Sequence, residues 1–127
     1  MAIELITREK DNQKTPTRVF SKRQEKDVAK ATGGKVNPNS GATDFGGKAD
    51  VNISNLISVE CKTKTTKSKS VSIKKEWLDK LKQETVFDGH KYSALAFSFG
   101  PGEENHYIID EELFIKLCEV LEYESSK

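Results

Sequence analysis

The feature that most constrains the fold is a pair of short alternating segments joined by a tight turn. Residues 48–53 and 56–63 alternate apolar with polar side chains, and Ser54-Asn55 separates them. Successive residues of a β-strand point to opposite faces of a sheet, so each segment is predicted to be a strand with one buried face. The short polar turn favours pairing of the two strands as an antiparallel hairpin.

The rest of the chain supplies helices and further strands around this hairpin. Apolar residues at helical spacing and capping residues predict helices, and short apolar runs bounded by turn residues predict strands. In chain order we expect a helix over 21–32, a short strand over 35–38, a loop over 39–47, the hairpin, a helix from 72 or 73 to 87, strands over 92–99 and 106–109, and a helix over 110–121. This order predicts an α/β fold with a mixed central β-sheet flanked by helices.

Two of the expected helices carry apolar stripes that we expect to face the sheet. The stripe of the second helix comprises Trp77, Leu78 and Leu81 and extends to Val86, and that of the last helix comprises Leu113, Phe114, Leu117, Cys118 and Leu121. The first helix is expected to begin at Ser21 as its N-cap, with Gln24 completing a capping box.

The 127-residue chain suits one domain. We expect a flexible arm over residues 1–20 and a single folded domain over 21–127. No apolar run approaches the roughly 20 residues that span a bilayer, and residues 1–10 contain no signal-peptide core. These features predict an intracellular, cytoplasmic protein that does not contact a membrane. Cys61 and Cys118 belong to no Cys/His cluster, which argues against a zinc site.

Charge is polarised along the chain, although the net charge is only +1. One segment is basic and contains Lys62, Lys64, Lys67, Lys69, Lys74, Lys75, Lys80 and Lys82 against Glu76 and Asp79. The segment after Pro101 is acidic and contains Glu103, Glu104, Asp110, Glu111, Glu112, Glu119, Glu122 and Glu124 against Lys116 and Lys127. Such a chain can present one basic face to nucleic acid, or merely a solvated lysine-rich surface.

The predicted hairpin carries the pattern D-x9-E-x-K, formed by Asp50, Glu60 and Lys62. Pairing of the strands would bring the two carboxylates together, and the lysine would leave the same face as the glutamate. Neighbouring carboxylates repel unless a cation lies between them, and Mg2+ prefers oxygen ligands of this kind. The backbone carbonyl of Cys61 could add another oxygen. Taken alone, the pattern also fits an ordinary cross-strand charge pair on a solvated sheet.

Several motifs occur in the order and spacing of a known family. They are Ser21-Lys22-Arg23-Gln24-Glu25, Asn39-Ser40-Gly41-Ala42, Lys48-Ala49-Asp50-Val51, Val59-Glu60-Cys61-Lys62-Thr63, Val71-Ser72-Ile73 and Ala94-Leu95-Ala96-Phe97-Ser98-Phe99. Over this span the chain resembles the small Holliday-junction resolvases of the PD-(D/E)xK nuclease superfamily, the archaeal type and its phage and bacterial relatives. Ala49 stands where that family often has proline. The resemblance implies a restriction-endonuclease-like core of order αβββαβ.

The resemblance also implies roles for individual residues. Asp50 and Glu60 would bind the metal, which is Mg2+ with Mn2+ as a substitute, and Lys62 would be catalytic. Glu25 of the first helix would complete the metal environment. Ser40 would contact the substrate near the scissile phosphate.

Contacts with DNA are expected mainly from basic side chains, because phosphates dominate such interfaces. The candidates are Arg23, Lys48, Lys64, Lys67 and Lys69. The resolvases that the chain resembles are homodimers that cut two strands of a four-way junction, so a two-fold dimer is expected. Its interface is expected on apolar parts of the second helix and nearby strands.

Two other functions fit the same residues. The first is a nuclease of this superfamily that acts on a flap, a nick or a restriction site, since fold does not fix the substrate. The second is a DNA-binding module without catalysis. A small nuclease core of this kind suits a phage or mobile-element protein.

Overall fold

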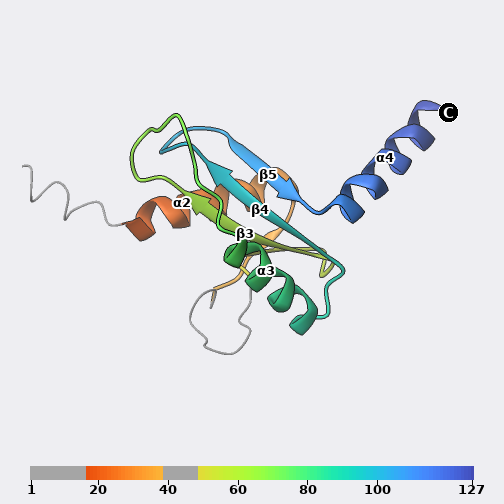
Figure 1. Ribbon diagram of the computed structural model, residues 1–127, viewed down its shortest axis with the longest axis horizontal. Helices are drawn as coiled ribbons and strands as arrows, with labels where there is room; N and C mark the ends of the chain where they lie inside the picture. Colours follow the sequence, from red (N-terminus) through yellow and green to blue (C-terminus); the bar gives the residue numbers. More distant parts are fainter. Residues whose placement is uncertain (1–16, 39–48) are drawn as a thin grey trace, which may run out of the picture.

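The computed structural model describes residues 17–38 and 49–127. These residues form a five-stranded sheet of order β1-β2-β3-β4-β5 with helices against its two faces (Figure 1). The elements are α2 (Thr17–Thr32), β1 (Lys35–Val36), β2 (Val51–Ile53), β3 (Ile57–Thr63), α3 (Lys75–Phe87), β4 (Tyr92–Ser98), β5 (Asn105–Ile109) and α4 (Glu111–Ser125). The predicted α/β class with a mixed central sheet flanked by helices is confirmed.

The sheet is mixed because one of its strand pairs is parallel. β3 and β4 run parallel with α3 as the crossover between them, whereas the other neighbours are antiparallel. The β2–β3 hairpin forms as expected, with Val51 opposite Val59. Ser54 and Asn55 both have a φ of 55°, the conformation that a tight hairpin turn requires.

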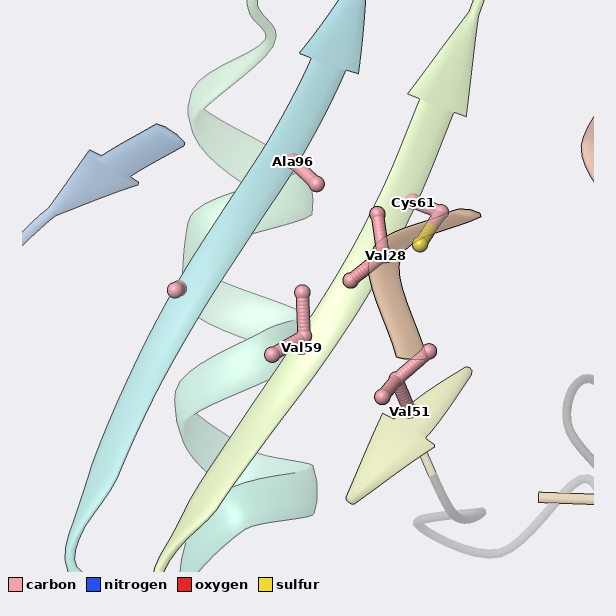
Figure 2. Packing of buried hydrophobic residues seen from close by; sticks show 6 residues of the cluster. Val28, Val51, Val59, Cys61 and Ala96 are labelled. Carbon is pink, nitrogen blue, oxygen red and sulfur yellow. The ribbon is translucent and has the colours of Figure 1, made fainter. Parts of the chain in front are cut away.

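Two hydrophobic clusters cover the two faces of the sheet. On one face Val28 of α2 packs against Val51, Val59 and Cys61 (Figure 2). On the other face Leu81 of α3 packs against Leu95 of β4. Successive residues of β3 point to opposite faces of the sheet. From Val59 to Thr63, the residues that face α2 are therefore mainly apolar, and those that face α3 are polar.

Helix α2 begins earlier than expected, at Thr17. The predicted capping box at Ser21 is wrong, because the Ser21 hydroxyl donates to the carbonyl of Thr17 within the helix. Gln24 is buried instead, and its amide nitrogen donates to the carbonyl of Lys62 at 2.8 Å. Most of the predicted arm, residues 1–20, lies outside the described residues.

The predicted inner faces of the other two helices need correction. Val86 is 77% exposed, and Glu84 and Thr85 are buried in its place, because the helical repeat from Leu81 continues through them. In α4 only Leu113 is buried. The rest of its apolar stripe is not covered by the sheet, because α4 extends away from it (Figure 1). Among the described helices none is long and apolar enough to cross a membrane.

Candidate active site

Asp50 lies where the β2–β3 pairing ends. Beyond the Val51–Val59 pair, the Asp50 carboxylate accepts the backbone N–H of Cys61 at 2.8 Å. A side chain therefore replaces the backbone partner at this point, and the two strands separate. The backbone of Asp50 is fixed from the other side, because its carbonyl accepts the N–H of Asn37 at 2.9 Å.

The carbonyl of Cys61 opens on the same edge of β3 as its N–H, because both groups of a strand residue face the same neighbour. It is therefore directed toward the gap beside Asp50, as a backbone ligand would need. The thiol of Cys61 leaves the plane of the sheet and enters the cluster around Val28 (Figure 2). Burial and the nearby carboxylates of Asp50, Glu25 and Glu60 raise the pKa of this thiol, so it stays protonated and apolar.

Glu60 and Lys62 share the face of β3 that is turned toward α3. The Lys62 ammonium lies 3.5 Å from the Glu60 carboxylate, and the two side chains are 33% and 25% exposed. The same ammonium lies 4.7 Å from the centre of the Trp77 ring. An ammonium held between a carboxylate and an aromatic face has a restricted position.

A cleft of about 420 Å³ opens between β3 and α3 over these residues. It is lined by Glu60, Lys62, Glu76, Trp77, Lys80, Leu81 and Glu84. The cleft gives a charged polar ligand access to the side chains of Glu60 and Lys62. Trp77, expected as a core residue, is half-buried and forms part of this wall.

The carboxylates of the site disfavour each other's charge. Burial and then the charge of Asp50 raise the pKa of Glu60 to about 7, while Lys62 opposes the shift. A side-chain hydrogen bond with Asp50 also raises the pKa of Glu60. Near neutral pH the pair therefore holds a proton part of the time, and a divalent cation could replace that proton.

Glu25 lies on α2, on the opposite side of Asp50 from the cleft. Its pKa is raised to about 7, first by burial and then by the charge of Asp50, with Lys22 opposing. It lines a separate cavity of about 540 Å³ together with Asn37 and Pro38. Glu25 is thus electrostatically coupled to Asp50, but it does not enter the cleft that holds Glu60.

Glu84 is a site residue that sequence reasoning missed. Its side chain is buried at the wall of the cleft and lies 3.7 Å from the Lys80 ammonium. Burial and, to a lesser degree, the charges of Asp50 and Asp88 raise its pKa, while Lys80 lowers it. The signal was its spacing: Glu84 follows Trp77 and Leu81 at the repeat of the buried stripe, where a carboxylate is unusual.

The donor set fits a hard divalent cation, although the structure does not assemble every expected ligand. Within residues 17–38 and 49–127, no three His, Cys, Asp or Glu side chains are grouped so that they could hold a metal ion together. Asp50 and Glu60, with the Cys61 carbonyl directed toward them, would supply the oxygen ligands. Mg2+ binds to such partial sites and keeps several waters.

The structure describes four of the basic residues that were expected to contact DNA. Lys64, Lys67 and Lys69 are exposed on the loop after β3, and Arg23 is exposed on α2. The loop is attached to the end of β4, because the N–H of Ser68 donates to the carbonyl of Phe99 at 2.7 Å. Ser40 and Lys48 lie outside the described residues, so their expected roles stay predictions.

Comparison with known proteins adds no relative: no family model matches the chain, and no curated protein matches it. The chemistry of the site is therefore derived from its own side chains. These are two coupled carboxylates, one positioned ammonium and an open polar cleft.

Proposed function

We propose that the protein is a metal-dependent endodeoxyribonuclease of the PD-(D/E)xK class. The observation that carries the proposal is the arrangement of three side chains. Asp50 accepts the backbone N–H of Cys61, next to Glu60, and the Lys62 ammonium lies 3.5 Å from Glu60 in the wall of an open cleft. Phosphodiester hydrolysis needs oxygen ligands for a cation and a positive group near the developing charge. The carboxylates of Asp50 and Glu60 can provide the oxygen ligands, and the ammonium of Lys62 can provide the positive group.

Each residue would have a separate role in the reaction. Asp50, Glu60 and the Cys61 carbonyl would hold the cation, which is Mg2+ or Mn2+, with Glu25 acting on Asp50 from the side of α2. A cation bound there would polarise the phosphate and activate a water for attack. Lys62 would stabilise negative charge on the phosphate as the bond breaks, and its contacts with Glu60 and Trp77 already hold it in place.

The element order supports a restriction-endonuclease-like core. The sequence α2, β1, β2, β3, α3, β4 has the order αβββαβ that the resemblance implies. In this arrangement Asp50, directly before β2, and Glu60 of β3 lie where those strands separate. This position of the carboxylates supports the proposed class.

The substrate we propose is branched DNA, most specifically a four-way junction that is cut at two symmetric positions. Exposed lysines on the loop after β3 favour contact with phosphates and not with base edges. A homodimer would present two such sites, one for each strand that is cut.

The test is cleavage of a synthetic four-way junction in Mg2+, compared with linear, nicked and flap DNA. We expect paired symmetric cuts in the junction alone. Cutting of the flap or the linear duplex would support the nuclease activity and contradict the proposed substrate. Junction binding without cleavage of any DNA would identify a binding module and overturn the proposed activity.

A further inference from the structure

A buried amide joins helix α2 to the strand that carries Lys62. Gln24 is only 5% exposed, and its Nε2 donates to the main-chain carbonyl of Lys62 at 2.8 Å and to Oδ1 of Asn105 at 3.0 Å. The same nitrogen lies 3.4 Å from the carbonyl of Ala96. One side chain of α2 therefore contacts acceptors on three neighbouring strands, β3, β4 and β5.

The oxygen of the same amide is left unpaired. Oε1 of Gln24 is buried and has no hydrogen-bond partner among the described residues. An unpaired buried acceptor costs about 1–3 kcal/mol of folding free energy. The other buried residue of α2, Val28, is apolar and packs in the core cluster. An apolar residue at position 24 would avoid the cost of Oε1, but it would provide no donor for the Lys62 carbonyl. The contacts of the N–H groups therefore distinguish glutamine from an apolar residue here.

The contact with the Lys62 carbonyl fixes the backbone from which the ammonium extends. On the other face of β3, the ammonium lies 3.5 Å from the Glu60 carboxylate and 4.7 Å from the centre of the Trp77 ring. Both of these contacts are made by the end of a flexible four-carbon chain, so they do not by themselves fix the backbone. Lys62 is therefore held at two points, at its main chain from α2 and at its ammonium on the side of α3.

The neighbour of Gln24 in α2 connects the same helix to the other side of the site. Glu25 lines a cavity of about 540 Å³ together with Asn37, whose N–H donates to the carbonyl of Asp50. Successive helix residues are rotated by about 100°, so one turn of α2 presents Gln24 to the strands and Glu25 to this cavity. A shift of α2 would move both side chains. Gln24 therefore fixes the position of Lys62 relative to the helix that carries Glu25.

We propose that Gln24 is a positioning residue for Lys62. Its N–H groups hold the main chain of Lys62 against α2, so that the ammonium is in place before a substrate binds. Gln24 does not touch the substrate, because it is buried between α2 and the sheet, on the opposite face from the cleft. This role rests on the proposed function, in which the Lys62 ammonium stabilises negative charge on the phosphate.

The first experiment follows the position of Lys62 without any cleavage. Trp77 is the only tryptophan of the chain, and an ammonium over the ring alters the polarity around it, so its fluorescence emission reports on Lys62. Gln24→Met removes the N–H donors and keeps the side chain unbranched. It should shift the emission in the same direction as Lys62→Met, and it should add little to Lys62→Met in the double variant. Wild-type emission in Gln24→Met, or full addition of the two shifts, would overturn the proposal.

Ser58→Ala is the matched control for the loss of a buried hydrogen bond. Ser58 lies on the same strand as Lys62, is 1% exposed, and its hydroxyl is hydrogen-bonded to Nδ1 of His90 at 2.8 Å. The circular dichroism spectra of both variants should match the wild type, and only Gln24→Met should shift the emission of Trp77. An equal shift in Ser58→Ala would mean that the emission follows a general loosening of the sheet, which contradicts the proposal. If Gln24→Met does not fold, Gln24→Leu replaces it.

The second experiment separates the rate of cleavage from the binding of DNA. In single-turnover cleavage of a four-way junction, Gln24→Met should lower the rate constant by roughly 10- to 100-fold, because the ammonium is displaced, and leave the Kd for the junction unchanged. A raised Kd with an unchanged rate constant would contradict a positioning role. If the wild-type protein cuts no DNA, the proposed function fails, and the emission of Trp77 still decides whether Gln24 positions Lys62.

Discussion

At the scale of single residues, Asp50 organises the site. Its carboxylate accepts the N–H of Cys61, and its charge adds to burial in raising the pKa of Glu60, Glu25 and Glu84. A cluster of acids held together in this way costs stability when all of them are ionised. A bound cation would remove that cost.

Glu60→Gln should separate function from stability. The uncharged amide cannot neutralise a cation, so cleavage is expected to fall by roughly 100-fold or more. Above pH 7, where Glu60 is ionised beside Asp50, the same change should raise the free energy of unfolding by about 1 kcal/mol. Cleavage assays and denaturant unfolding measure the two effects.

The control for Glu60→Gln is Glu76→Gln, because Glu76 lines the same cleft but is exposed. It should change neither the free energy of unfolding nor cleavage appreciably. If Glu60→Gln destabilised the protein above pH 7, the repulsion between Glu60 and Asp50 would be contradicted.

The raised pKa values also fix how stability depends on pH. The pKa values of Glu60 and Glu25 are raised in the folded protein from the ordinary 4.5 to about 7. Between these values the folded state binds more protons than the unfolded state, so their contribution to stability is full below pH 4.5 and is lost as pH rises through 7.

Addition of Mg2+ should oppose that loss, because the cation binds the ionised carboxylates. Thermal unfolding with and without Mg2+ measures this, and the increase in Tm should be larger above pH 7 than at pH 5. An equal increase at both pH values would mean that the ion binds elsewhere. The Glu60→Gln variant should lose most of the increase.

At the scale of elements, sequence patterns located the hairpin but not every helix face. The alternation around Glu60 and Lys62 required only the period of a strand, which is fixed by backbone geometry. The predicted inner face of α3 was wrong at the end of the helix. Apolar Val86 was expected to be buried there, whereas the helical repeat from Leu81 leads to Glu84. The apolar spacing of α4 was recognised, but its predicted inward orientation was wrong, because no pattern in the sequence shows that the helix extends away from the sheet.

The basic loop after β3 depends on Gly100. Its φ is +152°, and a Cβ at this position would lie 2.6 Å from the backbone Cα of Lys67. Gly100→Ala should therefore force the loop off the end of β4 and cost at least about 2 kcal/mol of folding free energy. We also expect weaker DNA binding, because Lys64, Lys67 and Lys69 would lose their fixed support.

Gly102→Ala is the control for that change. Gly102 has a φ of +78° in the same turn, but a Cβ there meets nothing within 4 Å. It should cost only about 1 kcal/mol, from backbone strain alone, and leave DNA binding unchanged. Equal effects of the two substitutions on unfolding and on DNA affinity would contradict the role of the Gly100–Lys67 contact.

At the scale of the whole molecule, the α/β class followed from the order of elements, since a strand, a helix and a strand favour a parallel pair with a crossover. The approach of Asp50 to Glu60 followed from the hairpin. What the sequence could not provide were the separation of β2 and β3 at Asp50, the position of Glu25 on the far side of that residue, and the exposure of α4. Each of these depends on packing between elements distant in the chain.

The central claim is that Asp50, Glu60 and Lys62 form one metal-dependent hydrolytic centre. Its most direct test is the single-turnover rate of four-way junction cleavage as Mg2+ is varied, for the wild-type protein and for Asp50→Asn purified identically. We predict cleavage that saturates with Mg2+, disappears with a chelator and falls by roughly 100-fold or more in the variant. Cleavage that persists unchanged in Asp50→Asn, or wild-type protein that binds the junction without cutting it at any Mg2+ concentration, would contradict the claim.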